Sequence, residues 1–221
     1  MQLFEVMRST FAARDFTDDP LPDDVIFEIL DNARFAPSGG NRQGNRVIIV
    51  RDNESRAQLA KLVVPAAKKY IAQTQLGESP WNTIVPTKVT PSQIEQAVVP
   101  EMLFDQYTSA QVVLVFLVNL ELVASMDSEI DRVGIISGAS IYPFVWNVLM
   151  AARQLGFGGS ITTLPIAKEP SIKELFHIPS NFAVCALVPM GRPKKQLTKL
   201  SRRPVEEIAS LETFDGNPLT K

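Results

Sequence analysis

The longest uncharged stretch of the chain, from Val133 to Ala152, most restricts how this protein folds. It is long enough to cross a bilayer as a helix, and Gly134 and Gly138 repeat the spacing at which membrane helices pack closely. Several polar side chains and Pro143 interrupt it, however, and nothing else in the chain resembles a second membrane span. We therefore expect one long helix over 133–155 that lacks a polar face and is buried in a core or a subunit interface.

The composition is that of a globular protein. Hydrophobic residues make up 45% of the 221 residues and charged residues 21%, which favours a single domain over residues 1–221 with ample apolar surface for a core. The formal net charge of −2 argues against a dedicated nucleic-acid binder. The N-terminus lacks a secretory signal, and one cysteine with one histidine cannot form a disulfide or a structural zinc site. We therefore expect a cytoplasmic protein without a bound metal.

Helical and extended patterns alternate along the chain. Apolar residues at helical spacing predict helices at the N-terminus, after Pro22 and around residues 59–70. Three continuous apolar runs predict strands that are buried on both faces, Val47–Val50, Val112–Val118 and Phe182–Val188. This order indicates an α/β or α+β sandwich whose central sheet is covered by helices on both faces.

Two segments depart from this alternation. Residues 77–105 hold several prolines without a regular apolar period, so we expect a mobile insertion near the site, with one short helix begun by Thr90 and Pro91. Residues 192–221 begin with a basic stretch, include a short acidic helix near Glu206, and have too few apolar residues to fold alone. We expect this C-terminal extension to lie over the body or over a partner subunit.

Several common catalytic signatures are absent. The glycines of residues 156–159 follow a helix and lack the last glycine of a dinucleotide-binding fingerprint, and Ser160 stands where a Walker loop needs lysine. No G-x-S-x-G elbow accompanies His177, as a Ser-His-Asp hydrolase would require. Cys185 lies inside an apolar strand, where an unreactive buried thiol is common. No side chain is therefore assigned as a catalytic acid, base or nucleophile.

Two glycine loops suit a flat, phosphorylated cofactor. The first loop has no bulky side chain at its centre and consists of Ser38, Gly39, Gly40, Asn41, Arg42 and Gln43. Such a loop, like the one at residues 156–160, lets peptide N–H groups approach a ring closely. Arg14 and either Arg202 or Arg203 could bind a phosphate dianion. Helix termination and tight turning explain both loops equally well, and isolated arginines are usually solvated.

Four segments, in order, resemble the nitroreductase family. They are Arg14–Pro22, Ala36–Gln43, Asn147–Gly158 and the stretch from His177 to Glu207. They are similar to that family's opening, its central helix with the flavin loop, and its last strand with the terminal arginine motif, over about residues 8–208. The resemblance implies an α+β three-layer sandwich, in which helices flank a central, mostly antiparallel sheet and a C-terminal arm is swapped between two subunits.

The resemblance also implies a function. It implies an FMN-dependent oxidoreductase that takes hydride from NAD(P)H and reduces nitroaromatic, quinone or similar small-molecule acceptors by ping-pong turnover. It further implies a homodimer with two flavins at the subunit interface, which would explain an uncharged helix. By position, Arg14 and Arg202 would contact the FMN phosphate. The loop from Ser38 to Gln43 would contact the ribityl chain and ring, and Gly158 and Gly159 the N5 edge of the ring.

The chain departs from the family pattern at two places. Many members carry another arginine and a serine where this chain has Thr10–Ala13, and many have Pro-Trp where Gly44 and Asn45 follow Gln43. A flavin-consuming or dehalogenating relative is therefore an alternative, since one fold serves several reactions. A non-catalytic protein that stores flavin or regulates through it is another. Neither a membrane nor a nucleic acid is an expected partner.

Overall fold

A computed structural model describes all residues, 1–221. Its centre is a four-stranded sheet made of β1 (Asn45–Val50), β2 (Val112–Asn119), β3 (Gly158–Gly159) and β4 (Phe182–Gly191). The strands follow the spatial order β1-β2-β4-β3, and all three pairings are antiparallel. The apolar runs predicted as strands therefore form β1 and the two central strands.

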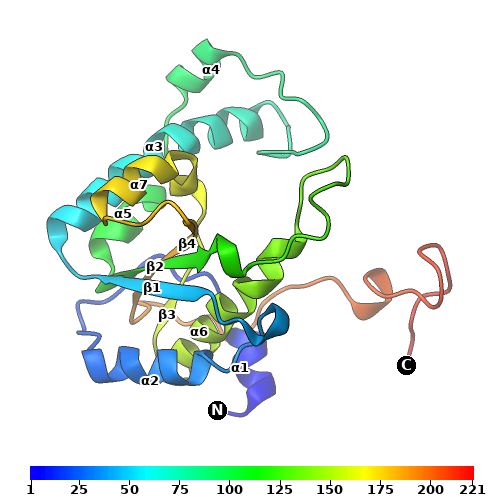
Figure 1. Ribbon diagram of the computed structural model, residues 1–221, viewed down its shortest axis with the longest axis horizontal. Helices are drawn as coiled ribbons and strands as arrows, with labels where there is room; N and C mark the ends of the chain where they lie inside the picture. Colours follow the sequence, from blue (N-terminus) through cyan, green and yellow to red (C-terminus); the bar gives the residue numbers. More distant parts are fainter.

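Helices cover both faces of this sheet (Figure 1). They are α1 (Leu3–Ser9), α2 (Asp23–Ala33), α3 (Asn53–Gln75), α4 (Pro91–Gln96), α5 (Met102–Ser109), α6 (Tyr142–Gln154) and α7 (Glu169–Leu175). Helices α2 and α6 lie on one face, and α3, α5 and α7 lie on the other (Figure 1). This arrangement confirms the predicted α+β three-layer sandwich.

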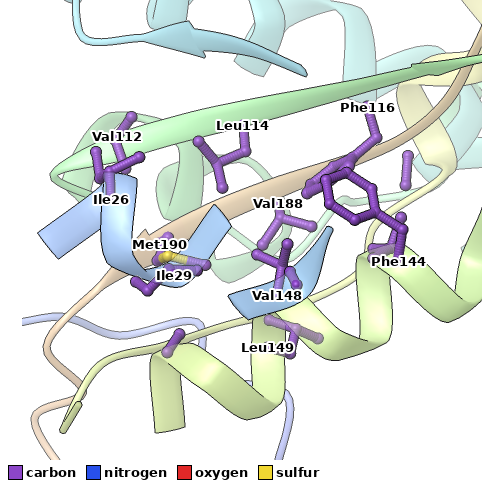
Figure 2. Close-up of a cluster of buried hydrophobic side chains, with 14 of the residues drawn as sticks. Ile26, Ile29, Val112, Leu114, Phe116, Phe144, Val148, Leu149, Val188 and Met190 are labelled. Atoms are coloured by element: carbon purple, nitrogen blue, oxygen red, sulfur yellow. The ribbon is translucent and has the colours of Figure 1, made fainter. Parts of the chain in front are cut away.

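Side chains of β2 point alternately to the two faces of the sheet, and they pack into two separate hydrophobic cores. Leu114 and Phe116 point toward α2 and α6, where the ring of Phe116 meets that of Phe144 edge to face at 5.7 Å (Figure 2). Val113 and Val115 point the opposite way, toward α3 and α7. Because both faces are covered, β2 is apolar at nearly every position, which is why its sequence shows a continuous run.

The predicted long helix over 133–155 is wrong in its first part. The α-helix begins only at Tyr142, and the preceding residues form a loop with a short 3₁₀ segment, Ile136–Ser140. Pro143 lies in the first turn of α6, where its missing N–H costs nothing, so it starts the helix and does not interrupt it.

Within one chain this stretch is not buried on all sides, and its burial at a subunit interface stays a prediction. Val133 and Ile135 are exposed, and Tyr142 and Trp146 of α6 itself remain partly exposed. Gly134 and Gly138 lie outside the helix, and a Cβ at Gly138 would meet the ring of Tyr142 and not a neighbouring helix. These two glycines therefore do not bring two helices into close contact within one chain. No helix of the chain has both the length and the apolar character needed to cross a bilayer.

The segment 77–105 contains more regular structure than the sequence predicts. Helix α4 begins as expected at Thr90, whose hydroxyl and the side chain of Gln93 form a reciprocal capping box. The segment then enters α5, which the apolar pattern does not reveal. Helix α7 is a second helix missing from the prediction, and its buried Ile172 packs against the sheet.

The C-terminal extension is attached to the body only at its start. Lys194 pairs with Asp15 at 2.9 Å, and the side-chain amide of Gln196 donates to the carbonyl of Ser9 at 3.1 Å. Beyond that point the chain projects away from the sandwich (Figure 1). Only a short 3₁₀ turn, Val205–Glu207, forms where an acidic helix is predicted.

Candidate functional site

A cavity of about 630 Å³ lies beside the β3 edge of the sheet. Residues from five parts of the chain line it: Arg14, Tyr70, Pro80, Trp81, Leu103, Gln106, Ile161, Thr162, Thr163, Leu164, Ile166 and Ala167. Arg14 is the one charged side chain among them, and no aspartate, glutamate, histidine or cysteine lines the cavity. The cavity therefore favours a ligand that brings negative charge or hydrogen-bond acceptors.

Arg14 reaches the cavity because the segment before it is attached to the second glycine loop. Ala12 pairs with Gly159 in a parallel bridge, and the N–H of Ala13 donates to the carbonyl of Gly159 at 3.0 Å. The half-buried guanidinium of Arg14 has no carboxylate within ion-pair distance, and its one hydrogen bond is a long contact of 3.4 Å to the carbonyl of Ala12. Its fork of donors is thus available to a ligand.

The strand that leaves Gly159 offers further donors. Thr162 uses its backbone in two hydrogen bonds with Leu187, each of 2.9 Å. In an antiparallel pairing the neighbouring residues point their backbone groups the other way. The N–H groups of Ile161 and Thr163 accordingly have no partner in the chain, while both residues line the cavity.

Helix α5 supports this strand from behind. Gln106 and Tyr107 are both buried, and Gln106 accepts a hydrogen bond from the hydroxyl of Ser160 at 2.9 Å. The hydroxyl of Tyr107 lies 3.1 Å from that of Thr162. Burial raises the pKa of Tyr107, so the phenol stays protonated and can donate to Thr162. These bonds fix the strand that carries the free N–H groups.

Gly158 and Gly159 are needed for packing. Both are buried in β3, and a Cβ at Gly159 would lie 2.6 Å from the carbonyl oxygen of Pro189 and 2.8 Å from Val188. They border a small pocket next to Arg153 and do not line the main cavity. Any contact with the edge of a ligand ring would pass through the backbone next to the cavity.

The backbone of the first glycine loop turns sharply at the surface of the chain. The backbone φ angles of Gly40, Asn41 and Gln43 are 60°, 53° and 50°, all in the left-handed region that glycine and asparagine tolerate best. The hydroxyl of Ser38 accepts from the N–H of Gln43 at 2.9 Å, and Gly39 donates to Ser140 at 3.3 Å. The loop presents its polar groups to solvent at the start of β1.

The two glycine loops lie at opposite corners of the sheet. The first enters β1 at Asn45, opposite Val118, which pairs with Ala183 of β4, whereas Gly159 pairs with Met190. Three strand spacings of about 4.8 Å and seven residues of about 3.3 Å separate these corners, which amounts to about 27 Å. One chain therefore does not bring the first loop to the cavity.

Arg202 is also far from the cavity. It lies on the exposed C-terminal extension, beyond the last contact with the body, and donates to the carbonyl of Ser201 within that extension. Of the predicted cofactor residues, the structure thus brings together Arg14, Gly158 and Gly159. The loop from Ser38 to Gln43 and Arg202 lie elsewhere on the same chain.

The predicted site does not include the strand Ile161–Thr163 or the wall formed by Tyr70 and Trp81. Ile161–Thr163 directly follow the second glycine loop, so continuation of that loop is the signal that could have found them. Tyr70 and Trp81 carry no comparable signal, because only the folded insertion brings them to the cavity. Cys185 is excluded from chemistry here, since burial raises its pKa to about 12.

The structure is an α+β sandwich with a cavity beside the β3 edge of its sheet. The chain belongs to the nitroreductase family, whose sequence pattern matches residues 7–192. It is 24% identical over 216 residues to iodotyrosine deiodinase of Nematostella vectensis, covering 96% of this chain and 75% of that protein. It is 25% identical over 197 residues to NADH dehydrogenase of Thermus thermophilus, covering 88% of each.

A solved structure shows the same fold. Oxidized iodotyrosine deiodinase, crystallised with FMN and 3-iodo-L-tyrosine, superposes with a TM-score of 0.69 and 21% sequence identity. The superposition covers 96% of this chain and 100% of that one. This likeness confirms the architecture.

Proposed function

We propose that this protein binds FMN and works as a flavin oxidoreductase that uses NAD(P)H to reduce a small-molecule acceptor. The observation that carries the proposal is the cavity itself. It is lined by an unpaired Arg14 and by Ile161 and Thr163, whose N–H groups have no partner in the chain, and no carboxylate lines it. FMN fits these groups, because its phosphate is a dianion and its ring edge is rich in acceptors. Membership of the nitroreductase family supports the same choice.

Each part of the cavity has a defined task in this proposal. FMN, when bound, supplies the redox chemistry by accepting hydride from a nicotinamide and passing electrons to the acceptor. Arg14 holds the phosphate, and the N–H groups beside Thr162 hold the polar edge of the ring. Leu103, Leu164 and Ile166 exclude water from the ring. No protein acid or base is required, which agrees with the lack of titratable side chains other than Arg14 and Tyr70 in the lining.

A second copy of the chain would complete the site. The first glycine loop and Arg202 do not line the cavity within one chain, so we infer that they contact the flavin held by a partner subunit. The projecting arm supports this homodimer, because it exposes Val205, Ile208 and Phe214. Strand β1 is an unpaired sheet edge beside a groove with exposed Phe27, and it could receive such an arm.

Reductive dehalogenation is a second candidate, because relatives in sequence and in structure are named iodotyrosine deiodinases. In that reaction the reduced flavin supplies two electrons, a C–H bond replaces the carbon–halogen bond with a proton from solvent, and halide leaves. The same cavity would serve it. Release of iodide from 3-iodo-L-tyrosine by the chemically reduced protein distinguishes this candidate from the reduction of nitroaromatics or quinones.

The spectrum of the purified protein tests the proposal. We expect a yellow protein with a flavin band near ~450 nm that releases FMN on denaturation. Anaerobic NADH or NADPH should bleach this band, and a quinone or nitroaromatic should restore it through many turnovers. A protein that stays colourless after FMN is added would overturn the cofactor. A flavin that stays oxidised with both nucleotides would favour storage or regulation over catalysis.

A further inference from the structure

Part of the cavity lining is aromatic and apolar. Tyr70 from the end of α3, and Pro80 with Trp81 from the insertion, form this wall together with Leu103. Arg14, Thr162 and Thr163 are polar residues of the same lining. In the proposed function these polar residues hold the flavin, and the aromatic wall is then left for a second ligand. Trp81 is the largest side chain in it.

The insertion that carries Trp81 is fixed to α3 by a buried amide. Gln73 is 3% exposed, and its side-chain oxygen accepts the N–H of Trp81 at 3.1 Å. Glu78 extends this network by accepting from the hydroxyl of Thr87 and the N–H of Lys88, each at 2.6 Å. These bonds hold the backbone on both sides of Trp81, so the indole has a defined position at the cavity.

The backbone of Trp81 is strained in this position. Its φ angle is 56°, in the left-handed region that a bulky residue rarely adopts. Strain of this kind persists where surrounding contacts enforce it, and it concentrates at ligand sites. Glycine or asparagine would adopt this turn more easily. A tryptophan there indicates a use for its ring.

A cation accompanies the indole. The ammonium of Lys69 lies 4.2 Å from the ring centroid of Trp81, and no carboxylate lies within ion-pair distance of it. Lys69 is not part of the cavity lining. It is therefore a cation beside the cavity that no carboxylate of the chain neutralises.

We propose that Trp81 and Lys69 select the electron acceptor, and that this acceptor is a planar aromatic molecule with a negatively charged substituent. The ring of the acceptor packs against the indole, and Lys69 attracts its charge. This inference rests on the proposed function in one respect, because the flavin must be held by the polar residues of the lining. It assigns the choice of substrate to the insertion and not to the strands that hold the cofactor.

Tryptophan fluorescence tests the contact without turnover. The chain has two tryptophans, Trp81 in the cavity and Trp146 on α6. Titration of the flavin-loaded protein with 4-nitrobenzoate should quench fluorescence in the wild type and in Trp146→Phe. Trp81→Phe should show only the weak residual effect of absorption by the probe. Equal quenching in the wild type and Trp81→Phe would overturn the contact, even if the protein proves to be a flavin reductase.

Acceptor kinetics test the charge preference. The wild type should bind 4-nitrobenzoate more tightly than neutral 4-nitrobenzyl alcohol, and Lys69→Met should reduce this preference by about three- to fivefold. Trp81→Ala should raise KM for both acceptors by about tenfold with little change in kcat, and Trp81→Phe should restore most of the affinity. Unchanged KM values in Trp81→Ala, with flavin retained, would overturn the assignment. If Lys69→Met kept the full preference for 4-nitrobenzoate over 4-nitrobenzyl alcohol, the role of Lys69 in attracting a negatively charged acceptor would be overturned.

Discussion

Asp127 shows how a single buried carboxylate can organise a long loop. It is 3% exposed, accepts the N–H of Ile135 at 2.7 Å and pairs with Arg132 at 2.7 Å. Hydrogen bonds from the N–H of Ile135 and from the guanidinium of Arg132 hold the pKa of Asp127 well below its usual range. The loop between β2 and α6 therefore depends on an ionised aspartate.

The pH dependence of stability follows from this depressed pKa. The stabilisation by Asp127 is complete above the unfolded-state value of about 3.9 and is lost as pH falls toward the folded-state pKa. We expect Asp127→Asn to lower the melting temperature at neutral pH. Below about pH 4, the melting temperatures of the variant and the wild type should come closer together. Circular dichroism during heating measures both.

The exposed neighbour Asp131 provides a matched control for this prediction. It makes no ion pair and no side-chain hydrogen bond, so Asp131→Asn should melt like the wild type across the whole pH range. A difference between Asp127→Asn and the wild type that is the same at neutral and acidic pH would contradict the role of the ionised carboxylate.

Residue type alone predicts only part of the candidate site. Arg14 could be predicted because a guanidinium is an obvious phosphate ligand, and the structure places it at the cavity without an ion-pair partner. Ile161 and Thr163 could not, because their contribution is a free backbone N–H that depends on how Thr162 pairs with Leu187. Trp81 depends similarly on the folded insertion. Sequence patterns report side chains well and unpaired backbone groups poorly.

Strand β3 consists of only two glycines, yet it closes the sheet beside the cavity. Its backbone lies so close to β4 that a Cβ at Gly159 would collide with the carbonyl oxygen of Pro189. We expect Gly159→Ala to lower the free energy of unfolding by about 1–3 kcal/mol, because neither backbone can move without breaking the pairing. Urea denaturation measures this, and flavin content should fall with it.

Gly134→Ala separates this effect from a general cost of replacing glycine. A Cβ at Gly134 would meet its nearest neighbour, Asp127, at 3.5 Å, which is an ordinary contact. Its free energy of unfolding should stay within about 0.5 kcal/mol of the wild type. Equal stability of the two alanine variants would show that β3 tolerates a wider separation from β4.

The elements differ in how well the sequence predicts them. Strands β2 and β4 are predicted well, because strands buried on both faces must be apolar at nearly every position. The start of α6 is not predicted well, because the residues of the loop before it are uncharged like those of the helix. The boundary depends on backbone hydrogen bonds, which residue type does not report. Helices α5 and α7 have only 8 and 7 residues, too few for a clear apolar period.

At the scale of the whole molecule, several features of one chain lack a partner within that chain. Its cavity holds Arg14 but not the first glycine loop, and its arm carries Arg202 away from the body (Figure 1). The grooves beside β1 and the apolar side chains of the arm are both exposed. Each of these features would be satisfied if two copies exchanged their arms.

We therefore predict an obligate homodimer that depends on the arm. Light scattering should give twice the chain mass of 24.4 kDa, with an interface above about 2,000 Å² that dilution does not separate into stable monomers. A chain that ends at Gln196 keeps the hydrogen bond of Gln196 and the ion pair of Lys194 with its own body, and it should lose both dimerisation and flavin. Arg202→Ala in the full chain should remain dimeric and weaken FMN binding by roughly ten- to a hundredfold, because only a charge-assisted contact is removed. A monodisperse species of one chain mass that still holds FMN would contradict the shared site.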